Sequence, residues 1–403
     1  CSMLLCVAAA QAADDELELD EAAEQGARTT GILQFDVART YARPEHWSMA
    51  RARAELTAQG GSQGLKWKIS GRADADAVFA IDSGFYPDAV RRDQQYQFDL
   101  RETYVDFSAG DVDIRLGRQH IVWGEMVGLF FADVVSARDL RSFYLPEFEQ
   151  LRIPQWAARA EYYFGDTHAE LVWIPVPSYD RIGKPGAEFY PMQLPQGTRM
   201  RGEVKPDNTL ANSNWGARLS RQFGGWDLSG FYYRSLDVAQ TFYQVGSFGN
   251  EFEPRHDRIT QIGGTMAKDF GEFVLKGELV HARGRKYNTF NPALNPDGLV
   301  AQNTMDYAFG VDIPAFRDGR VNLQYFGRRT FDLNPAIGLD RGAAWFLVVM
   351  RAVGAAAAGG AGAGAAASLI GVVETTALKF NAAGRERLGR RGTAAGAHDL
   401  GSL

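Results

Sequence analysis

The strongest constraint on the fold is a two-residue alternation of apolar and polar side chains that recurs along most of the chain. Met305, Tyr307 and Phe309, for example, are separated by Asp306 and Ala308. This period predicts β-strands with one apolar face and one polar face. The alternating segments run for roughly 8–12 residues, longer than the strands of about 5–6 residues that are typical of soluble sheets. Many end in Trp, Tyr or Phe, which favours a transmembrane β-barrel with aromatic girdles.

The connections between these segments alternate between short and long. We predict fourteen strands, near 32–41, 47–58, 65–81, 95–108, 112–122, 156–164, 167–174, 212–223, 226–234, 258–268, 272–281, 303–313, 320–329 and 343–351. Short turns such as Gly165-Asp166 follow every second strand, and long connections such as 175–211 follow the others. Outer-membrane barrels have this connectivity, with short periplasmic turns and long outer loops. The predicted fold class is therefore an all-β, antiparallel transmembrane barrel, with about 14 strands here out of 16 or more.

The two flanking segments do not share the alternation. Residues 1–12 contain a short apolar run and a small-x-small site, which predicts the remnant of an export signal. Residues 13–31 form an acidic leader expected in the periplasm, and 352–403 form a low-complexity tail rich in Ala and Gly. The barrel is then expected over 32–351, in the cell outer membrane.

Composition and motifs argue against several functions. A formal net charge of −6 disfavours a general nucleic-acid binder, whose domain would be basic. Both cysteines, Cys1 and Cys6, fall in the signal remnant, so no thiolate metal site is expected. We find no paired-histidine metal motif, nucleophile elbow, phosphate-binding loop or dinucleotide fingerprint, and predict neither an enzyme nor a cofactor.

The densest cluster of polar and aromatic residues lies between 114 and 125. If Leu116 faces lipid, the alternation directs Arg115, Gln119, Trp123 and Glu125 into the lumen. Arg118 then falls on the outer face, so it must lie near the membrane boundary or be turned inward by a bulge.

The connection that follows, 126–153, is too apolar for a simple surface loop. It begins with an apolar piece at 127–131, and Ser136 and Asp139 have the spacing of a helix start. We expect it to fold into the barrel as a constriction or plug, with Asp139, Arg141, Glu147 and Arg152 as counter-groups for the 115–125 cluster. A solvent-side loop with surface ion pairs is the alternative.

Further charged residues are predicted to face the lumen, with both signs mixed. Such mixing suits a hydrated lumen with internal ion pairs, and it does not resemble a selectivity ring of one sign. The residues are Arg159, Glu161, Glu170, Arg218, Asp227, Lys276, Glu278 and Asp306.

The order of several motifs resembles the Gram-negative outer-membrane proteins catalogued as domain of unknown function 1302. The resembling pieces are Asp99–Asp106, the Gly117-Arg118-Gln119 and Trp123-Gly124-Glu125 motif, Asp139–Arg141, Leu145–Glu149, Arg152–Pro154 and Glu161–Asp166. The resemblance implies an outer-membrane barrel with no settled activity, associated with the handling of hydrophobic or lipid-like compounds. It names no catalytic residue.

Three functions remain open at this point. The first is a channel for small solutes, narrowed by 126–153. The second is a gated component of lipid or hydrophobic-compound transport, with a periplasmic partner docking at the short turns and leader. The third is a hydrolase embedded in the barrel. All three require contact with outer-membrane lipids and insertion by the barrel-assembly machinery.

Overall fold

The computed structural model describes residues 27–62, 64–126, 131–142, 148–191, 197–246, 250–289, 298–315, 319–334, 337, 342–353 and 368–371. The predicted signal remnant and most of the leader and tail lie outside these residues. Within them, the first strand begins at Arg28 and another ends at Val353, so the predicted boundaries of the leader and the tail are each slightly wrong.

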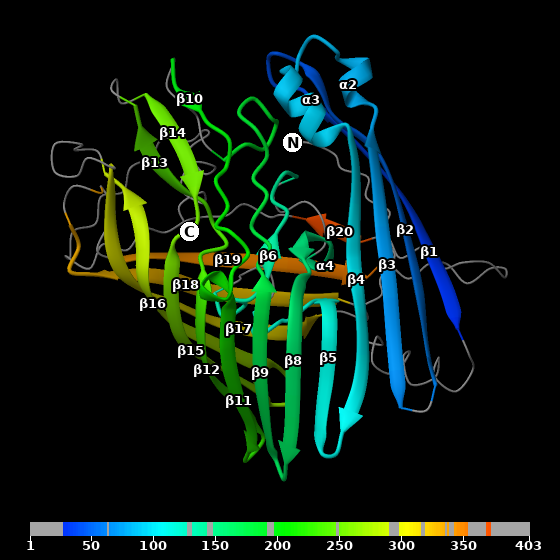
Figure 1. Cartoon of the computed structure of the whole chain (residues 1–403), viewed down its shortest axis with the longest axis vertical. Coiled ribbons are helices and arrows are strands. Elements are labelled where there is room, and N and C mark those ends of the chain that lie inside the picture. The colour runs from blue at the N-terminus through cyan, green and yellow to red at the C-terminus, as the bar shows by residue number, and fades with distance from the viewer. Residues whose placement is uncertain are drawn as a thin grey trace.

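One antiparallel sheet of fifteen strands dominates the described chain (Figure 1). The strands are β1 (Arg28–Thr40), β2 (His46–Ser62), β3 (Leu65–Asp76), β4 (Tyr96–Ala109), β5 (Val112–Gln119), β8 (Gln155–Phe164), β9 (Thr167–Val176), β11 (Asn214–Phe223), β12 (Trp226–Leu236), β15 (Arg258–Asp269), β16 (Val274–Asn288), β17 (Leu299–Ala315), β18 (Gly319–Phe331), β19 (Gly342–Val353) and β20 (Ser368–Gly371). Each pairs with the next member of this series. In Figure 1, β17–β19 cross the upright β2–β5 at a steep angle, because the sheet curls around an interior.

The described sheet confirms the predicted fold class. Its first fourteen strands, β1 to β19, correspond one by one to the fourteen predicted segments, and β20 is additional. The prediction of a strand from 65 to 81 is wrong at its end, where β3 stops at Asp76. The Asp76 carboxylate accepts the backbone N–H groups of Ala50 and Val78, and this contact starts the helical turn α2 (Val78–Ile81).

The remaining elements lie in the long connections between strands. They are α3 (Asp88–Gln94), β6 (Ala137–Arg138), α4 (Phe148–Leu151), β7 (Arg152–Ile153), β10 (Arg199–Met200), the 3₁₀ turn η1 (Leu210–Asn212), β13 (Thr241–Val245) and β14 (Glu251–Arg255). Strands β10, β14 and β13 form a small separate sheet, and β6 pairs with β7. No helix among the described residues is long and apolar enough to span a membrane.

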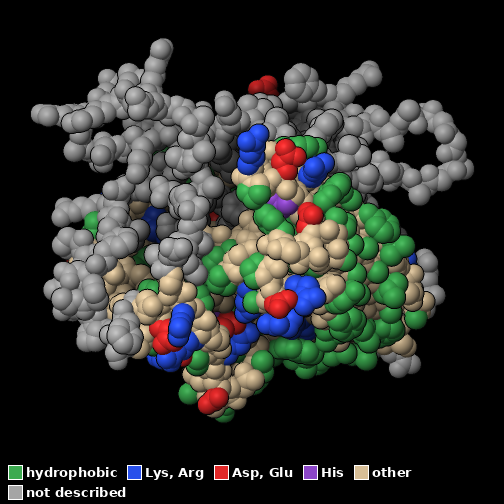
Figure 2. Space-filling view, turned by 90° about the horizontal axis from the view of Figure 1, so that it is seen from above, with side chains coloured by type: hydrophobic (Ala, Val, Ile, Leu, Met, Phe, Trp, Pro, Cys, Tyr) green, Lys and Arg blue, Asp and Glu red, His purple; other side chains and the backbone are tan. Residues whose placement is uncertain are grey.

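The distribution of side chains across the sheet is inverted relative to a soluble protein. Large apolar side chains are exposed on the outer face, including Leu56, Ile69, Phe98, Leu116, Leu171, Leu219, Ile262, Leu279, Phe309 and Leu323. Polar and charged side chains at alternate positions are buried inside, including Arg53, Ser70, Asp99, Gln119, Glu170, Gln261, Glu278, Thr304, Asp306 and Gln324. Figure 2 shows hydrophobic side chains covering the right-hand flank. An apolar exterior and a polar interior are what a lipid-embedded barrel requires.

Candidate functional site

The chain leaves β5 and turns directly into the barrel interior. The described residues 120–126, 131–142 and 148–153 belong to one inward segment, which we call the plug. Ile121, Trp123 and Val135 from the plug are buried in one cluster with Ile174 of β9 and Phe231 of β12. Because these partners lie on the inner wall, the described residues of the plug pack inside the curled sheet, as we expected, and the alternative of a solvent-side loop is wrong.

Trp123 is the central side chain of this contact and has no exposed surface. Its indole N–H donates a hydrogen bond of 3.1 Å to the carboxylate of Glu170. Its ring centroid lies 5.3 Å from that of Phe231 and 5.7 Å from that of Tyr233. The indole N–H therefore has a hydrogen-bond acceptor on β9, and the ring packs against two aromatic rings of β12. These contacts hold the plug against β9 and β12.

Gly216 on β11 provides the space that the indole occupies. A Cβ atom at this position would lie 2.9 Å from Trp123 Cη2 and 2.7 Å from the backbone oxygen of Tyr232. We predict that Gly216→Val displaces Trp123 and also strains the pairing of β11 with β12, at a combined cost of about 3 kcal/mol. The readout is the protection of the Met126 amide in the plug against hydrogen exchange, which should fall. Ala217→Val, one residue along the strand, is the matched control and should behave as wild type; equal behaviour of both variants would contradict the role of Gly216.

Glu278 of β16 clamps the backbone of the plug across the lumen. Its carboxylate accepts the N–H groups of Glu125 at 2.6 Å, Met126 at 2.8 Å and Ala132 at 2.9 Å. Glu278 is only 2% exposed. Hydrogen bonds to a buried charged acceptor are among the stronger ones in proteins, so three on one carboxylate form a firm attachment.

The tip of the plug reaches the wall beyond Glu278. Met126 is buried against Ala308 of β17 and Phe326 of β18. The ring of Phe131 lies 6.0 Å from that of Phe326. The described residues of the plug thus make contacts from β5 to β18 across the inside of the curled sheet.

The predicted helix start at Ser136 is wrong. Its hydroxyl donates to the backbone oxygen of Ile121 or to the carboxylate of Asp133, each at 3.0 Å, and the residues that follow form β6. Arg152 of β7 holds Asp133 at 2.8 Å. These contacts fold the plug onto itself as a short hairpin-like unit.

Residues 139–142 of the plug, which we call its outer arm, are held by ion pairs and hydrogen bonds. Arg141 pairs with Asp139 and also donates to the backbone oxygen of Asp93 at 3.1 Å. Arg181, from the connection after β9, lies 2.8 Å from Asp99 of β4 and 3.7 Å from Asp139. Burial alone would raise the pKa of Asp139, but the hydrogen bond and charge of Arg141, with the charge of Arg181, outweigh it and hold that pKa well below its usual range.

The lowered pKa of Asp139 predicts the pH range in which the outer arm loosens. A carboxylate with a depressed pKa in the folded state stabilises that state above its unfolded pKa of about 3.9, and this stabilisation is lost as the pH falls below it. We expect protection of the Asp139 and Leu140 amides against hydrogen exchange, corrected for the intrinsic pH dependence of exchange, to fall below about pH 4. Asp139→Asn should show lower protection of these amides at pH 7 and a weaker response to acid. An equal acid response in wild type and Asp139→Asn would contradict this assignment.

Among the described residues, the predicted counter-groups Asp139, Arg141 and Arg152 pair with other charged groups and not with the 115–125 cluster. Arg115 pairs instead with Asp106 of the neighbouring β4 at 2.6 Å, and its guanidinium lies over the Tyr104 ring. Gln119 donates to the backbone oxygens of Arg115 and Ala157. The prediction that plug residues pair with Arg115 and Gln119 failed because these two residues bind partners on their own strand or on an adjacent one.

Glu125 differs from expectation, and for Arg118 one of the two predicted arrangements is excluded. The backbone of Glu125, not its side chain, makes the main attachment, and its carboxylate lies 3.5 Å from Arg218 of β11. Arg118 is half-buried on β5, whose registers with β4 and β8 are unshifted, so no bulge in its own strand turns it inward. Glu147 lies outside the described residues.

The predicted lumen charges form local pairs along the wall. Arg159 contacts Glu161 and lies 3.4 Å from Glu170, and Lys276 lies 3.1 Å from Asp312. Arg328 holds Asp306 at 2.5 Å, whereas Asp227 is exposed near a short turn. Their role in solute passage stays a prediction.

No curated protein matches the chain. Among solved structures, the chain is similar to OmpF of Salmonella typhi in complex with daunomycin (13% identity, 81% of this chain and 85% of that chain, TM-score 0.45). It is also similar to the outer-membrane protein OmpT of Vibrio cholerae, with 10% identity over 81% of this chain and 84% of that chain and a TM-score of 0.43. A third similar structure is OprB of Pseudomonas putida, with 12% identity over 84% of this chain and 88% of that chain and a TM-score of 0.43.

The family profile described as protein of unknown function (DUF1302) matches residues 16–302, which is more than half of the chain. This range includes the plug, the Glu278 clamp and the motifs that carried the resemblance. The chain therefore belongs to that family.

Proposed function

We propose that this protein is an outer-membrane channel for small solutes whose lumen is closed at rest by the plug. The observation that carries the proposal is the Glu278 clamp, which ties the plug backbone to the wall opposite β5. The buried inner side chains near Glu278 also support a closed lumen. Gln324, Thr304 and Asp306 are all less than 5% exposed, so the interior is filled at this level.

The apolar outer face supports placement in the outer membrane, where it would contact lipid. Mixed ion pairs along the inner wall favour passage of polar solutes over selection of one charge. Passage then requires the plug to move, because its contacts cross the lumen.

Planar-bilayer recording of the refolded protein tests this function. Wild type should be mostly closed, with rare, discrete openings. Complete absence of openings in a folded sample, in wild type and in the Glu278 variants described below, would contradict a channel. A steady large conductance in wild type would contradict closure by the plug.

One observation favours a gated transporter of hydrophobic compounds as the second candidate. The plug covers an apolar strip on the inner wall, formed by Val172, Ile174, Phe231, Tyr233 and Val280. Withdrawal of the plug would uncover this strip to an apolar solute. Binding of an apolar fluorescent fatty acid by a Glu278 variant, without any ion conductance, would favour this second function.

A further inference from the structure

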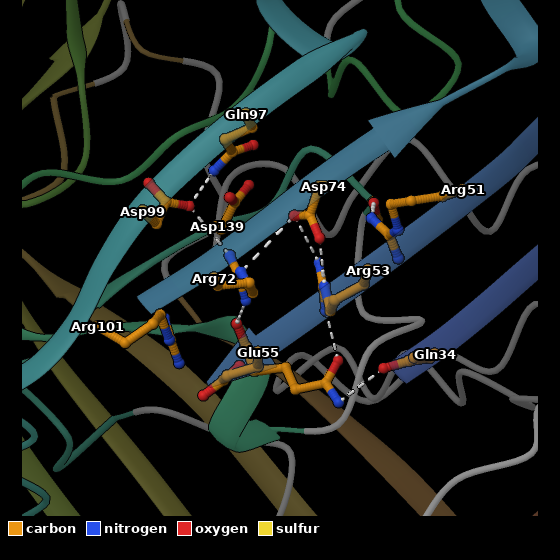
Figure 3. A network of polar contacts seen from close by, with 12 residues as sticks. Gln34, Arg51, Arg53, Glu55, Arg72, Asp74, Gln97, Asp99, Arg101 and Asp139 are labelled. Carbon is orange, nitrogen blue, oxygen red and sulfur yellow. Dashed lines mark hydrogen bonds and ion pairs between the residues drawn. The ribbon is translucent and has the colours of Figure 1, made fainter. Parts of the chain in front are cut away.

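The two sides of the plug are chemically different. On one side, Ile121, Trp123 and Val135 pack in the apolar cluster against β9, β12 and β16. On the other side, Asp139, Arg141, Ser142 and Gln150 face the inner wall formed by β2, β3 and β4. Figure 3 shows this polar side, with charged side chains from all three strands directed at one another.

A small cavity of about 50 Å³ lies in this polar seam. That volume is enough for a few water molecules. Its charged lining consists of four arginines and four carboxylates: Arg51, Arg53, Arg72, Arg141, Asp74, Asp76, Asp139 and Glu188. The seam is therefore polar, and its lining has balanced charge.

The inner-wall arginines Arg51 and Arg53 each donate some guanidinium N–H groups to a carboxylate of the wall and others to the plug. Arg51 binds Asp36 at 2.7 Å and donates to the Ser142 hydroxyl at 3.1 Å. Arg53 binds Asp74 at 2.7 Å and donates to the Gln150 side-chain oxygen at 2.6 Å. Movement of the plug would free these plug-facing N–H groups while the wall carboxylates stay in place.

Arg72 continues the same arrangement on β3. It lies 3.2 Å from Asp99 and donates to the backbone oxygen of Gln150 at 3.4 Å. Its buried Nε has no hydrogen-bond partner within the part of the chain that the structure describes, and the nearest Asp74 oxygen is 3.6 Å away. A guanidinium N–H in a hydrated seam is available to water or to a carboxylate solute.

We propose that the solute path runs along this seam and favours small zwitterions, which carry an ammonium and a carboxylate group. The inference rests on the proposed channel function and deepens it. A zwitterion can pair its carboxylate with a released arginine and its ammonium with Asp74 or Asp99. A singly charged solute meets groups of its own sign at every step, and an apolar solute gains no partner here.

Cysteine accessibility locates the path. The only cysteines, Cys1 and Cys6, are replaced by serine. Ser142→Cys places a thiol in the seam, and Thr304→Cys places one on the inner wall of β17, away from the seam, where Thr304 has no exposed surface. Small charged methanethiosulfonates, added to open channels of a Glu278→Gln background, should modify Ser142→Cys and lower its conductance several-fold, whereas Thr304→Cys channels should be unaffected. Block through Thr304→Cys with no effect at Ser142→Cys would overturn the seam.

Flux of two isomers tests the solute class in the same background. Glycine is a zwitterion, and glycolamide has the same formula without charge. Liposome swelling should show faster entry of glycine, and Arg72→Gln should lower the glycine rate relative to glycolamide by about tenfold, the effect of losing one charged contact. Lys276→Gln, on the wall away from the seam, should leave the ratio unchanged. Equal rates for both isomers in an open channel would overturn the zwitterion preference, whereas absence of any flux would instead contradict the channel function.

Discussion

Glu278→Ala is expected to convert a mostly closed barrel into a frequently open one. The substitution removes the acceptor of three backbone N–H groups, two buried and one partly buried, at a cost of about 1–3 kcal/mol for each buried group. Even a loss of about 3 kcal/mol in plug seating raises the ratio of open to closed channels roughly 100-fold. Single-channel recording measures this ratio directly.

The effect should be graded and specific to the clamp. Glu278→Gln keeps one acceptor oxygen but loses the charge, so its open fraction should fall between wild type and Glu278→Ala. Glu161→Gln is the matched control, because Glu161 also faces the lumen but contacts Arg159 and His168 on the wall. If Glu161→Gln and Glu278→Gln open equally often, the clamp has no special role.

Gly117→Ala is expected to prevent formation of the folded barrel. Gly117 has φ +132°, and an added Cβ would lie 2.3 Å from the backbone oxygen of Thr103 and 2.7 Å from Tyr104 Cα. Both obstacles are the backbone of β4, which cannot move without breaking its pairing with β5. Backbone strain and overpacking together should cost about 3 kcal/mol or more.

Heat-modifiable gel migration reads out this prediction. Wild type should give a faster band when unboiled, and Gly117→Ala should lose most of it. Gly71→Ala is the control, since its added Cβ would meet Phe98 at an ordinary 3.6 Å. A normal folded band for Gly117→Ala would show that this motif glycine is dispensable.

The strands could be predicted because each depends on a local pattern. Alternation places Leu279 outside and Glu278 inside without knowledge of any partner strand. The end of β3 could not be predicted in this way, because the apolar residues Val78 and Phe79 continue the run. At the end of the strand the Asp76 carboxylate accepts the backbone N–H groups of Val78 and of Ala50 on β2, a contact that the local pattern does not carry.

The site was only partly predictable, for a related reason. Glu278 was expected in the lumen, but its attachment to Glu125 joins residues 153 positions apart, and no local pattern carries that pairing. The partner of Arg115 was within reach, because Asp106 lies opposite it across the short turn between β4 and β5. The seam arginines were missed, although Arg51 and Arg53 alternate with apolar residues on β2 as lumen-facing charges should.

Amide hydrogen exchange at Glu125, Met126 and Ala132 tests the central claim most directly, because these are the N–H groups that Glu278 holds. Wild-type protein in lipid nanodiscs should protect all three nearly as well as neighbouring strand amides, and Glu278→Ala should lose that protection while the strands keep theirs. Exchange of the three wild-type amides at the rate of an open surface loop would contradict closure of the lumen by the plug.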